Sequence, residues 1–282
     1  MLIRTLYERE RPGNKQNLSP ELSKLYDGDL SFPEANRPYV IANFVQTIDG
    51  IVSYQIPQRS SGTEISGGSA EDRFVMGLLR SSADAVLVGS GTLHGDAGHV
   101  RTPEFGYPGA SHLYRSFRRE MGKPHHPINV VLTASGRIDL NEPTFHTDGL
   151  KAVILTTEEG AERLAHDHGR ALSGTIVRST GEKGATSPGA VLKILAEEFS
   201  VRLLLHEGGP TIFGEFLSTG AIDELFLTVA PQVAGQTEVT RPGLAGTSSF
   251  LPETAPWFLV QSIKKSSTDV LFLRYVATAR TG

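Results

Sequence analysis

The stretch RLLLHEGGPTIFGEFL, residues 202–217, carries the strongest structural signal in the chain. Its mostly apolar start is typical of a buried strand, and a Glu-Gly-Gly turn then leads to Pro210, a residue favoured at the first position of a helix. Backbone N–H groups at a helix start point outward together, and the helix dipole adds partial positive charge there. Two glycines would let a bulky anion such as a pyrophosphate approach this backbone. A plain strand-to-helix turn explains the same residues equally well.

A second glycine loop follows another strand-like segment, in DAVLVGSGTLHGDAGHVR at residues 84–101. The apolar run ends in Gly-Ser-Gly, with Thr92, Asp96 and Arg101 beyond it. Ligands of open α/β sheets bind at the carboxyl ends of the strands. Both glycine loops are expected at such ends, so they would line one cleft if their strands are neighbours. The histidines here lack the spacing of a metal site, and no metal is expected.

Strand-like and helical segments alternate along most of the chain. Strands are predicted at 39–45, 85–89, 128–133, 152–157, 175–178, 202–206, 224–230, 258–263 and 270–276. Helices are predicted after Ser69, which has Asp72 three residues on as in a capping box, and at 158–168, 188–199 and 210–217. This alternation predicts an α/β fold with a largely parallel sheet. The last three strands have no helix between them, so the sheet is expected to end antiparallel.

The remaining segments give weaker expectations. Residues 1–37 are interpreted as an N-terminal arm with little structure of its own, ahead of a single domain at 38–282. The segment 97–127 is too long for an ordinary loop and is expected to be functional or mobile. Within it, Arg115–Arg119 is expected to form a solvated face, and His125-His126 are expected to be surface histidines.

Composition excludes several classes of protein. The chain has 282 residues, of which 39% are hydrophobic and 21% charged, with a net charge of −4 and no cysteine. No apolar run reaches the ~18–20 residues of a membrane helix, and the acidic balance disfavours nucleic acid as a partner. The lack of cysteine excludes disulfides, thiolate zinc sites and the zinc-dependent nucleobase deaminases that use cysteine ligands. The N-terminus lacks the apolar stretch of a secretory signal, so a cytoplasmic protein is expected.

The segment NFVQTIDGIVSY, residues 43–54, has two interpretations. Asp49-Gly50 between apolar runs is a strong hairpin signal. Asn43, Gln46 and Thr47 interrupt a strand that should be buried, and buried polar side chains need partners. A ligand or the neighbouring backbone would supply them.

Five motifs occur in a fixed order and together resemble one family. They are P-Y-V-x-x-N-x-x-x-T-x-D-G from residue 38, I-S-G with D-R-x-x-x-x-L-L-R from 65 to 80, D-A-V-L-V-G-x-G-T from 84 with Asp96, E-G-G-P-T from 207, and D-E-L-x-L-x-V-A-P-Q-V-x-G from 223. The chain resembles the riboflavin-biosynthesis reductases over residues 38–276. These comprise the reductase domain of the bifunctional deaminase/reductase and its stand-alone archaeal and fungal relatives.

The resemblance implies a dihydrofolate-reductase-like fold, NADPH as the cofactor, a homodimer, and no deaminase domain on this chain. The implied reaction converts the ribosyl group of a phosphoribosylaminopyrimidine to ribityl, by hydride transfer to the ribose C1′. One alternative is a reductase of the same fold acting on a pterin, a folate or another small substrate. A nucleotide-binding module without catalysis is another.

The resemblance also implies site residues, position by position. The substrate site is expected at Asn43, Thr47, Ser66, Arg80, Val100, Arg101 and Glu207. The cofactor site is expected at Val45, Thr92, Asp96, Ser135, Gly208, Gly209, Pro210, Thr211, Ile212 and Phe213. Ser135 and Arg137 would hold the 2′-phosphate of NADPH. No catalytic proton donor is assigned, and without the resemblance Arg80 would be interpreted as a cation at a helix end.

Two departures from the family concern the substrate side. Residues 63–69 are spaced differently from the corresponding loop of the bifunctional enzymes, and the loop after Asp96 is longer and lacks their usual proline. Asn43 matches the stand-alone enzymes, whereas the bacterial bifunctional ones carry lysine there.

Overall fold

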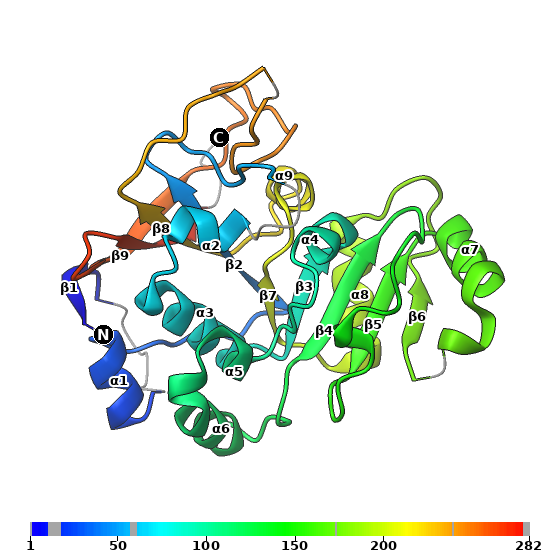
Figure 1. The fold of residues 1–282 in the computed structure, drawn as a ribbon, viewed down its shortest axis with the longest axis horizontal. Coiled ribbons are helices and arrows are strands. Elements are labelled where there is room, and N and C mark those ends of the chain that lie inside the picture. Colours follow the sequence, from blue (N-terminus) through cyan, green and yellow to red (C-terminus); the bar gives the residue numbers. More distant parts are fainter. Residues whose placement is uncertain (1, 11–17, 57–60, 173, 239, 279–282) are drawn as a thin grey trace.

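A ten-stranded sheet forms the centre of the computed structural model, which describes residues 2–10, 18–56, 61–172, 174–238 and 240–278. The strand order is β1-β9-β10-β8-β2-β7-β3-β4-β5-β6 (Figure 1). The strands are β1 (Ile3–Glu8), β2 (Tyr39–Thr47), β3 (Ala85–Gly89), β4 (Ile128–Thr133), β5 (Ala152–Thr156), β6 (Ile176–Ser179), β7 (Leu203–His206), β8 (Glu224–Ala230), β9 (Phe258–Ser266) and β10 (Leu271–Ala277). The helices are α1 (Pro20–Tyr26), α2 (Ser61–Ser66), α3 (Ala70–Ser82), α4 (Ser90–Gly95), α5 (Pro103–Gly106), α6 (Ser111–Glu120), α7 (Glu158–His168), α8 (Pro188–Phe199) and α9 (Pro210–Ser218).

The strand directions confirm the predicted sheet. All neighbours from β8 through β2, β7, β3, β4 and β5 to β6 are parallel. The other end is antiparallel, with β10 between β8 and β9, and β1 on the outer edge of β9. The chain therefore has the α/β fold with an antiparallel end that its segment pattern predicts.

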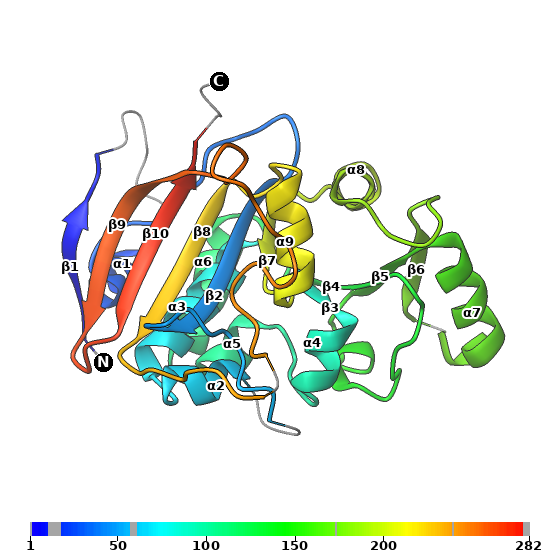
Figure 2. The same ribbon diagram turned by 90° about the horizontal axis from the view of Figure 1, so that it is seen from above.

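Helices cover both faces of the sheet (Figure 2). Helices α1, α3 and α6 pack on one face, and α8 and α9 pack on the other. Strand β2 contributes apolar side chains to both faces. Its Tyr39 and Ile41 join the core beside α3, whereas Val40 and Ala42 join the core beside α9. Successive side chains of a strand point to opposite faces, so a continuous apolar run is needed in the middle of the sheet. Among the described helices, none is long and apolar enough to cross a membrane.

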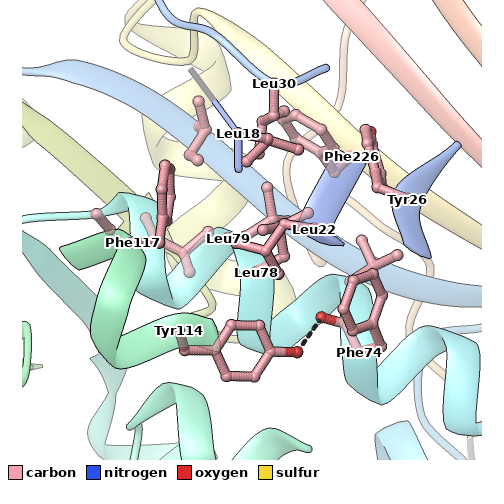
Figure 3. Close-up of a cluster of buried hydrophobic side chains, with 14 of the residues drawn as sticks. Leu18, Leu22, Tyr26, Leu30, Phe74, Leu78, Leu79, Tyr114, Phe117 and Phe226 are labelled. Atoms are coloured by element: carbon pink, nitrogen blue, oxygen red, sulfur yellow. Dashed lines mark hydrogen bonds between the residues drawn. The ribbon is translucent and has the colours of Figure 1, made fainter. Parts of the chain in front are cut away.

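The N-terminal residues are more structured than predicted. Strand β1 pairs with β9, and Ser19 caps α1 by accepting a hydrogen bond from the Leu22 backbone N–H. Leu22 and Tyr26 are buried in the same core as α3 (Figure 3). The expectation of little structure is wrong because these elements are too short to show a period and form through contacts with distant residues.

Much of the segment 97–127, which is expected to be functional or mobile, is folded into the helices α5 and α6. Helices α5 and α6 lie against α3, and the Tyr114 hydroxyl donates a hydrogen bond to the Phe74 carbonyl oxygen at 2.9 Å (Figure 3). Arg118 is 1% exposed, which corrects the prediction of a solvated face at Arg115–Arg119. Its guanidinium donates to the carbonyl oxygens of Ser81 and Ala83 at the end of α3, at 3.0 and 2.7 Å. These bonds satisfy carbonyls that lack a partner within the helix.

The hairpin predicted at Asp49-Gly50 does not form between neighbouring strands. The chain turns there, with the Thr47 N–H bonded to the Ile51 carbonyl oxygen at 3.0 Å, and Ile51 then bridges to Gly243. Both edges of β2 are already occupied by β7 and β8, so no following strand can pair with it.

Candidate active site

The two glycine turns meet at the carboxyl ends of β3 and β7, which are parallel neighbours, so the condition for a shared cleft is met. The Glu207 N–H donates to the Leu87 carbonyl oxygen at 2.9 Å. A Cβ atom on Gly208 would lie 3.3 Å from the Gly89 nitrogen, and one on Gly209 would lie 2.9 Å from Thr92 Oγ1. Gly209 has a φ of −60°, which any residue can adopt. Close approach of the two turns therefore explains the glycines, and backbone strain does not.

Helix α9 begins at this junction without a side-chain cap. Gly209 is its N-cap and offers no side chain, and the first helical hydrogen bond runs from the Phe213 N–H to the Gly209 carbonyl oxygen at 3.1 Å. The N–H groups of Thr211 and Ile212 precede it, so they have no acceptor within the helix. The Phe213 side chain is fully buried in the core, so a ligand at the helix start would meet only the backbone of this residue.

A buried ion pair lies beside the glycine turns, on the face of the sheet covered by α3. Arg80 donates from Nε and Nη2 to the two carboxylate oxygens of Glu207, both at 2.8 Å. Arg80 also donates from Nη1 to the Thr102 carbonyl oxygen at 3.2 Å, and its Nη2 lies 3.0 Å from His99 Nε2. The Arg80 side chain is 2% exposed and that of Glu207 is 9% exposed. Paired hydrogen bonds of this kind fix both side chains in one geometry.

Arg101 brings a second guanidinium close to the Arg80–Glu207 pair. It is 3% exposed, donates from Nη1 to the His99 carbonyl oxygen at 2.5 Å, and lies 3.7 Å from the Asp96 carboxylate. Burial and the positive charge of Arg80 lower the pKa of Arg101. Burial, Arg80 and Arg101 together lower the pKa of His99 to about 2, so this imidazole is neutral. Neighbouring guanidiniums that disfavour each other's charge favour an anion between them.

Asp72 is a titratable group of this region that the sequence marks as a capping-box residue and a motif letter, and not as a site residue. It stands in the first turn of α3, and burial with a smaller contribution from Glu207 raises its pKa to about 6. The hydroxyls of Thr228 and Ser66 hydrogen-bond to its carboxylate and oppose this shift, as does the charge of Arg73. The predicted substrate residue Ser66 is thus brought to Asp72. Asp72 lies between Glu71 and Arg73 in the first turn of the helix, where an acidic residue is common, so the sequence gives no sign of its buried environment.

The predicted residues of β2 have different environments. Asn43 and Val45 are half-buried on the face covered by α2 and α3. Thr47 is fully buried, and its hydroxyl donates to Asp49 Oδ1 at 2.5 Å and accepts from the Ile51 N–H at 3.0 Å. The Thr47 hydroxyl therefore makes its hydrogen bonds within the turn and does not face an open surface. Val100 is half-buried and accepts a backbone hydrogen bond from Thr102.

A cavity of about 430 Å³ lies between α4, the loop after β4 and the end of α7. Ser90, His94, Arg137 and His168 are among its lining residues. Gly136 in that loop has a φ of +69°, and a Cβ there would lie 2.2 Å from the Gly160 carbonyl oxygen, so only glycine fits. Ser135 is exposed and accepts a hydrogen bond from the Arg137 N–H at 3.3 Å, next to the lining rather than in it.

Comparisons with known proteins agree with this architecture. The family model described as the RibD C-terminal domain matches residues 38–271. The riboflavin biosynthesis protein RibD of Aquifex aeolicus is 25% identical over 77% of this chain and 52% of its own length, so the chain spans about half of that relative. The 2,5-diamino-6-ribosylamino-4(3H)-pyrimidinone 5′-phosphate reductase of Archaeoglobus fulgidus is 25% identical over 76% of this chain and 89% of its own length.

Solved structures share the fold. A pyrimidine reductase-like protein from Corynebacterium diphtheriae superposes with a TM-score of 0.67 at 22% identity, covering 86% of this chain and 93% of its own. Acinetobacter baumannii RibD gives a TM-score of 0.61 at 19% identity, covering 86% of this chain and 59% of its own. The family model covers most of the chain and the described strands follow the same fold. The chain belongs to the RibD C-terminal domain family.

Proposed function

We propose that this protein is an NADPH-dependent reductase that converts the ribosyl group of a phosphoribosylaminopyrimidine to a ribityl chain. The observation that carries the proposal is the meeting of the two glycine turns with the buried Arg80–Glu207 pair at one edge of the sheet. The backbone N–H groups at the start of α9 suit the pyrophosphate of a dinucleotide. The fixed Glu207 carboxylate, beside the guanidiniums of Arg80 and Arg101, suits a phosphorylated sugar. The name of the Archaeoglobus fulgidus relative supports the same reaction class.

The cofactor would lie along the carboxyl ends of β7, β3 and β4. Its pyrophosphate fits the start of α9, where the Thr211 and Ile212 N–H groups lack helical acceptors. Arg137 reaches the 430 Å³ cavity and would bind the 2′-phosphate that distinguishes NADPH from NADH. NADPH supplies a hydride when it is bound.

The substrate would lie on the α3 side of the same edge. Arg101, whose charge is held close to that of Arg80, would bind the substrate phosphate, and Glu207 would accept hydrogen bonds from ribose hydroxyls. Arg80 would position the Glu207 carboxylate through their paired bonds. Asn43 would bind the substrate from β2.

Reduction of the ribosylamine also consumes a proton. The C1′–O4′ bond breaks as the amino nitrogen that joins the pyrimidine to the ribose, keeping its hydrogen, forms a double bond to C1′. The O4′ atom takes the proton. Hydride addition at C1′ then returns the double-bond electrons to the nitrogen and completes the ribityl chain. We assign this proton donation to Asp72, which lies among Ser66, Thr228 and Glu207 and whose pKa, raised by burial to about 6, keeps part of its carboxyl group protonated close to neutrality. We expect Asp72→Asn to lower kcat by about 10²–10⁴-fold with little change in NADPH affinity. Glu71→Gln, a neighbouring carboxylate that bonds to the Leu2 backbone, is the matched control.

The reaction class is tested by following NADPH absorbance with a panel of substrates. A phosphoribosylaminopyrimidine should be reduced, whereas dihydrofolate and dihydropterin should not. Turnover of a pterin or folate alone would favour the alternative reductase of the same fold. Absence of turnover with every substrate, despite NADPH binding, would favour a binding module.

We further propose that the protein acts as a homodimer in the cytoplasm. The alternating apolar residues of the final strand, 270–276, taken alone predict an open sheet edge that a second chain would cover. Strand β10 is instead internal, because β8 and β9 occupy both its sides. Apolar residues remain exposed nearby, because Trp257 is 75% and Leu259 is 48% exposed at the start of β9. A second copy of the chain would cover them.

A further inference from the structure

A group of possible metal ligands lies away from the glycine turns, where α5 comes close to the chain that enters β4. The side chains are Glu104 of α5 and His125 and His126, and one ligand atom from each lies within 4.8 Å of the others. His125 Nε2 is 3.7 Å from Glu104 Oε1, and His126 Nδ1 is 3.7 Å from Glu104 Oε2. The two imidazole rings have centroids 4.0 Å apart. Residues 21 positions apart in the chain thus converge on one point.

Two of these atoms are buried without a partner. Glu104 Oε2 and His126 Nδ1 have no hydrogen bond among the described residues. Their side chains are each 14% exposed, whereas that of His125 is 55% exposed, so only His125 fits the expectation of a surface histidine. Arg115 donates to the other carboxylate oxygen, Glu104 Oε1, at 3.1 Å. This bond orients the carboxylate and leaves Oε2 free to bind a ligand.

We propose that Glu104, His125 and His126 form a binding site for a divalent transition-metal ion such as Zn²⁺. Two imidazole nitrogens and one carboxylate oxygen are a ligand set that Zn²⁺ uses, with bonds of about 2.0–2.2 Å. Ligand atoms around a tetrahedral ion are a little over 3 Å apart, and one ligand atom from each of the three side chains already lies within 4.8 Å of the others, so side-chain rotation would close the site around the ion. The exposed side of His125 leaves a fourth position for water.

The surroundings select among cations. Arg115 contacts the carboxylate, and Arg118, whose Nη2 atom is buried without a partner among the described residues, is close enough to Glu104 for the two charges to interact. This positive charge disfavours an ion held by electrostatic attraction alone, such as Mg²⁺ or Ca²⁺, which prefer oxygen ligands. Imidazole-binding ions such as Zn²⁺, Ni²⁺ or Co²⁺ gain coordinate bonds to nitrogen.

A bound ion would join α5 to the start of β4. Helix α5 follows Thr102, whose carbonyl oxygen accepts a hydrogen bond from Arg80. The ion would therefore fix one end of the segment that contacts the Arg80–Glu207 pair. Its role would be structural, because the ion site is separate from that pair.

Calorimetric titration of ZnCl₂ into the full chain, made without a histidine tag and freed of metal by a chelator, tests the site. We expect one Zn²⁺ per chain, no heat with MgCl₂, and a rise in melting temperature on adding Zn²⁺. His125→Gln and Glu104→Gln should each weaken Zn²⁺ binding by at least tenfold. His166→Gln, on the exposed face of α7, is the control and should bind as the native chain does.

The same measurements can overturn the proposal. Absence of Zn²⁺ binding in the native chain would show that water alone fills the space between the three side chains. Equal affinity in the native chain and in both ligand variants would place the ion elsewhere. His125 is exposed, so its variant is expected to fold, and circular dichroism of each variant verifies this.

Discussion

Arg80 lies at the end of α3 with all of its described partners inside the protein. Its guanidinium contacts Glu207, Thr102 and His99, and its side chain is 2% exposed. Arg118 takes the role at the helix end that the sequence alone would give to Arg80. The pair with Glu207 therefore combines a structural and a proposed functional role, because each side chain holds the other in place.

Replacing Arg80 should affect stability and substrate binding together. Arg80→Ala leaves the Glu207 carboxylate buried without its partner, and we expect the free energy of unfolding to fall by about 3–5 kcal/mol. In the variant that remains folded at low temperature, the KM for the pyrimidine substrate should rise far more than the Kd for NADPH. Arg178→Ala, which breaks the exposed pair with Glu198, should cost at most about 1 kcal/mol. An unchanged KM in Arg80→Ala would limit Arg80 to a structural role.

His206 gives a pH prediction with a definite sign. The His206 side chain is fully buried and packs among Phe44, Phe213 and Phe216. Burial lowers its pKa from the ordinary 6.5 to about 3. The unfolded chain therefore binds a proton more readily than the folded one. The contribution of the neutral His206 to the free energy of unfolding is fully present above pH 6.5 and is lost as the pH falls from 6.5 towards 3.

His206→Leu should reduce this pH dependence. The melting temperature of the native chain should fall between pH 7 and pH 5, and the variant should lose less over the same interval. His166→Leu, at an exposed position, should follow the native curve. Parallel curves for the native chain and His206→Leu would mean that His206 does not contribute to the acid sensitivity.

At the scale of elements, a helix of ten or more residues is predictable where a capping residue marks its start. Helices α7 and α8 have the predicted bounds, and each begins after a capping residue, Thr157 or Ser187. Helix α6 has no side-chain cap and is not predicted. Strands β3, β4 and β8 also match, since each is a mostly apolar run. Helices α1 and α5 were not predicted, because elements of 7 and 4 residues depend on tertiary contacts that no local pattern records.

The glycine turn before α9 makes a prediction at this scale. Gly209→Val should leave the chain folded, because the backbone there has an ordinary φ and the added Cβ meets only the Thr92 hydroxyl at 2.9 Å. The branched side chain would occupy the space of a pyrophosphate and abolish NADPH binding, measured by calorimetry. Gly189→Val is the control, since a Cβ at Gly189 meets no atom within 4 Å. A folded Gly209→Val variant that binds NADPH within about threefold of native would show that the turn binds no cofactor.

For the whole molecule, the pairing of β3 with β7 decides how much of the candidate site the sequence could reveal. The two glycine loops were recognisable from their residues, and their meeting was predicted only on the condition that the strands are neighbours. The Arg80–Glu207 pair joins residues 127 positions apart, and Asp72 gains its environment from Ser66 and Thr228 on other elements. Such contacts depend on which distant segments the fold brings together, so no local pattern in the sequence predicts them.

The proposed assembly is tested on the whole chain in solution. Light scattering should give a mass twice the 30.4 kDa of one chain at micromolar concentration. Trp257→Glu combined with Leu259→Glu places charge on the exposed apolar residues and should shift the mass to that of one chain. A native mass near 30.4 kDa would contradict the dimer, and an unchanged dimer in the double variant would place the interface elsewhere.

The proposal that one edge of the sheet joins NADPH to a phosphoribosylaminopyrimidine is tested most directly by following the hydride itself. The protein is incubated with that substrate and NADPH deuterated at the transferable C4 position, and the product is analysed by mass spectrometry and NMR. We expect a ribityl product that carries one deuterium at C1′, formed at the rate of NADPH oxidation and lost in Gly209→Val. A product without deuterium at C1′, or oxidation of NADPH without any ribityl product, would contradict the account.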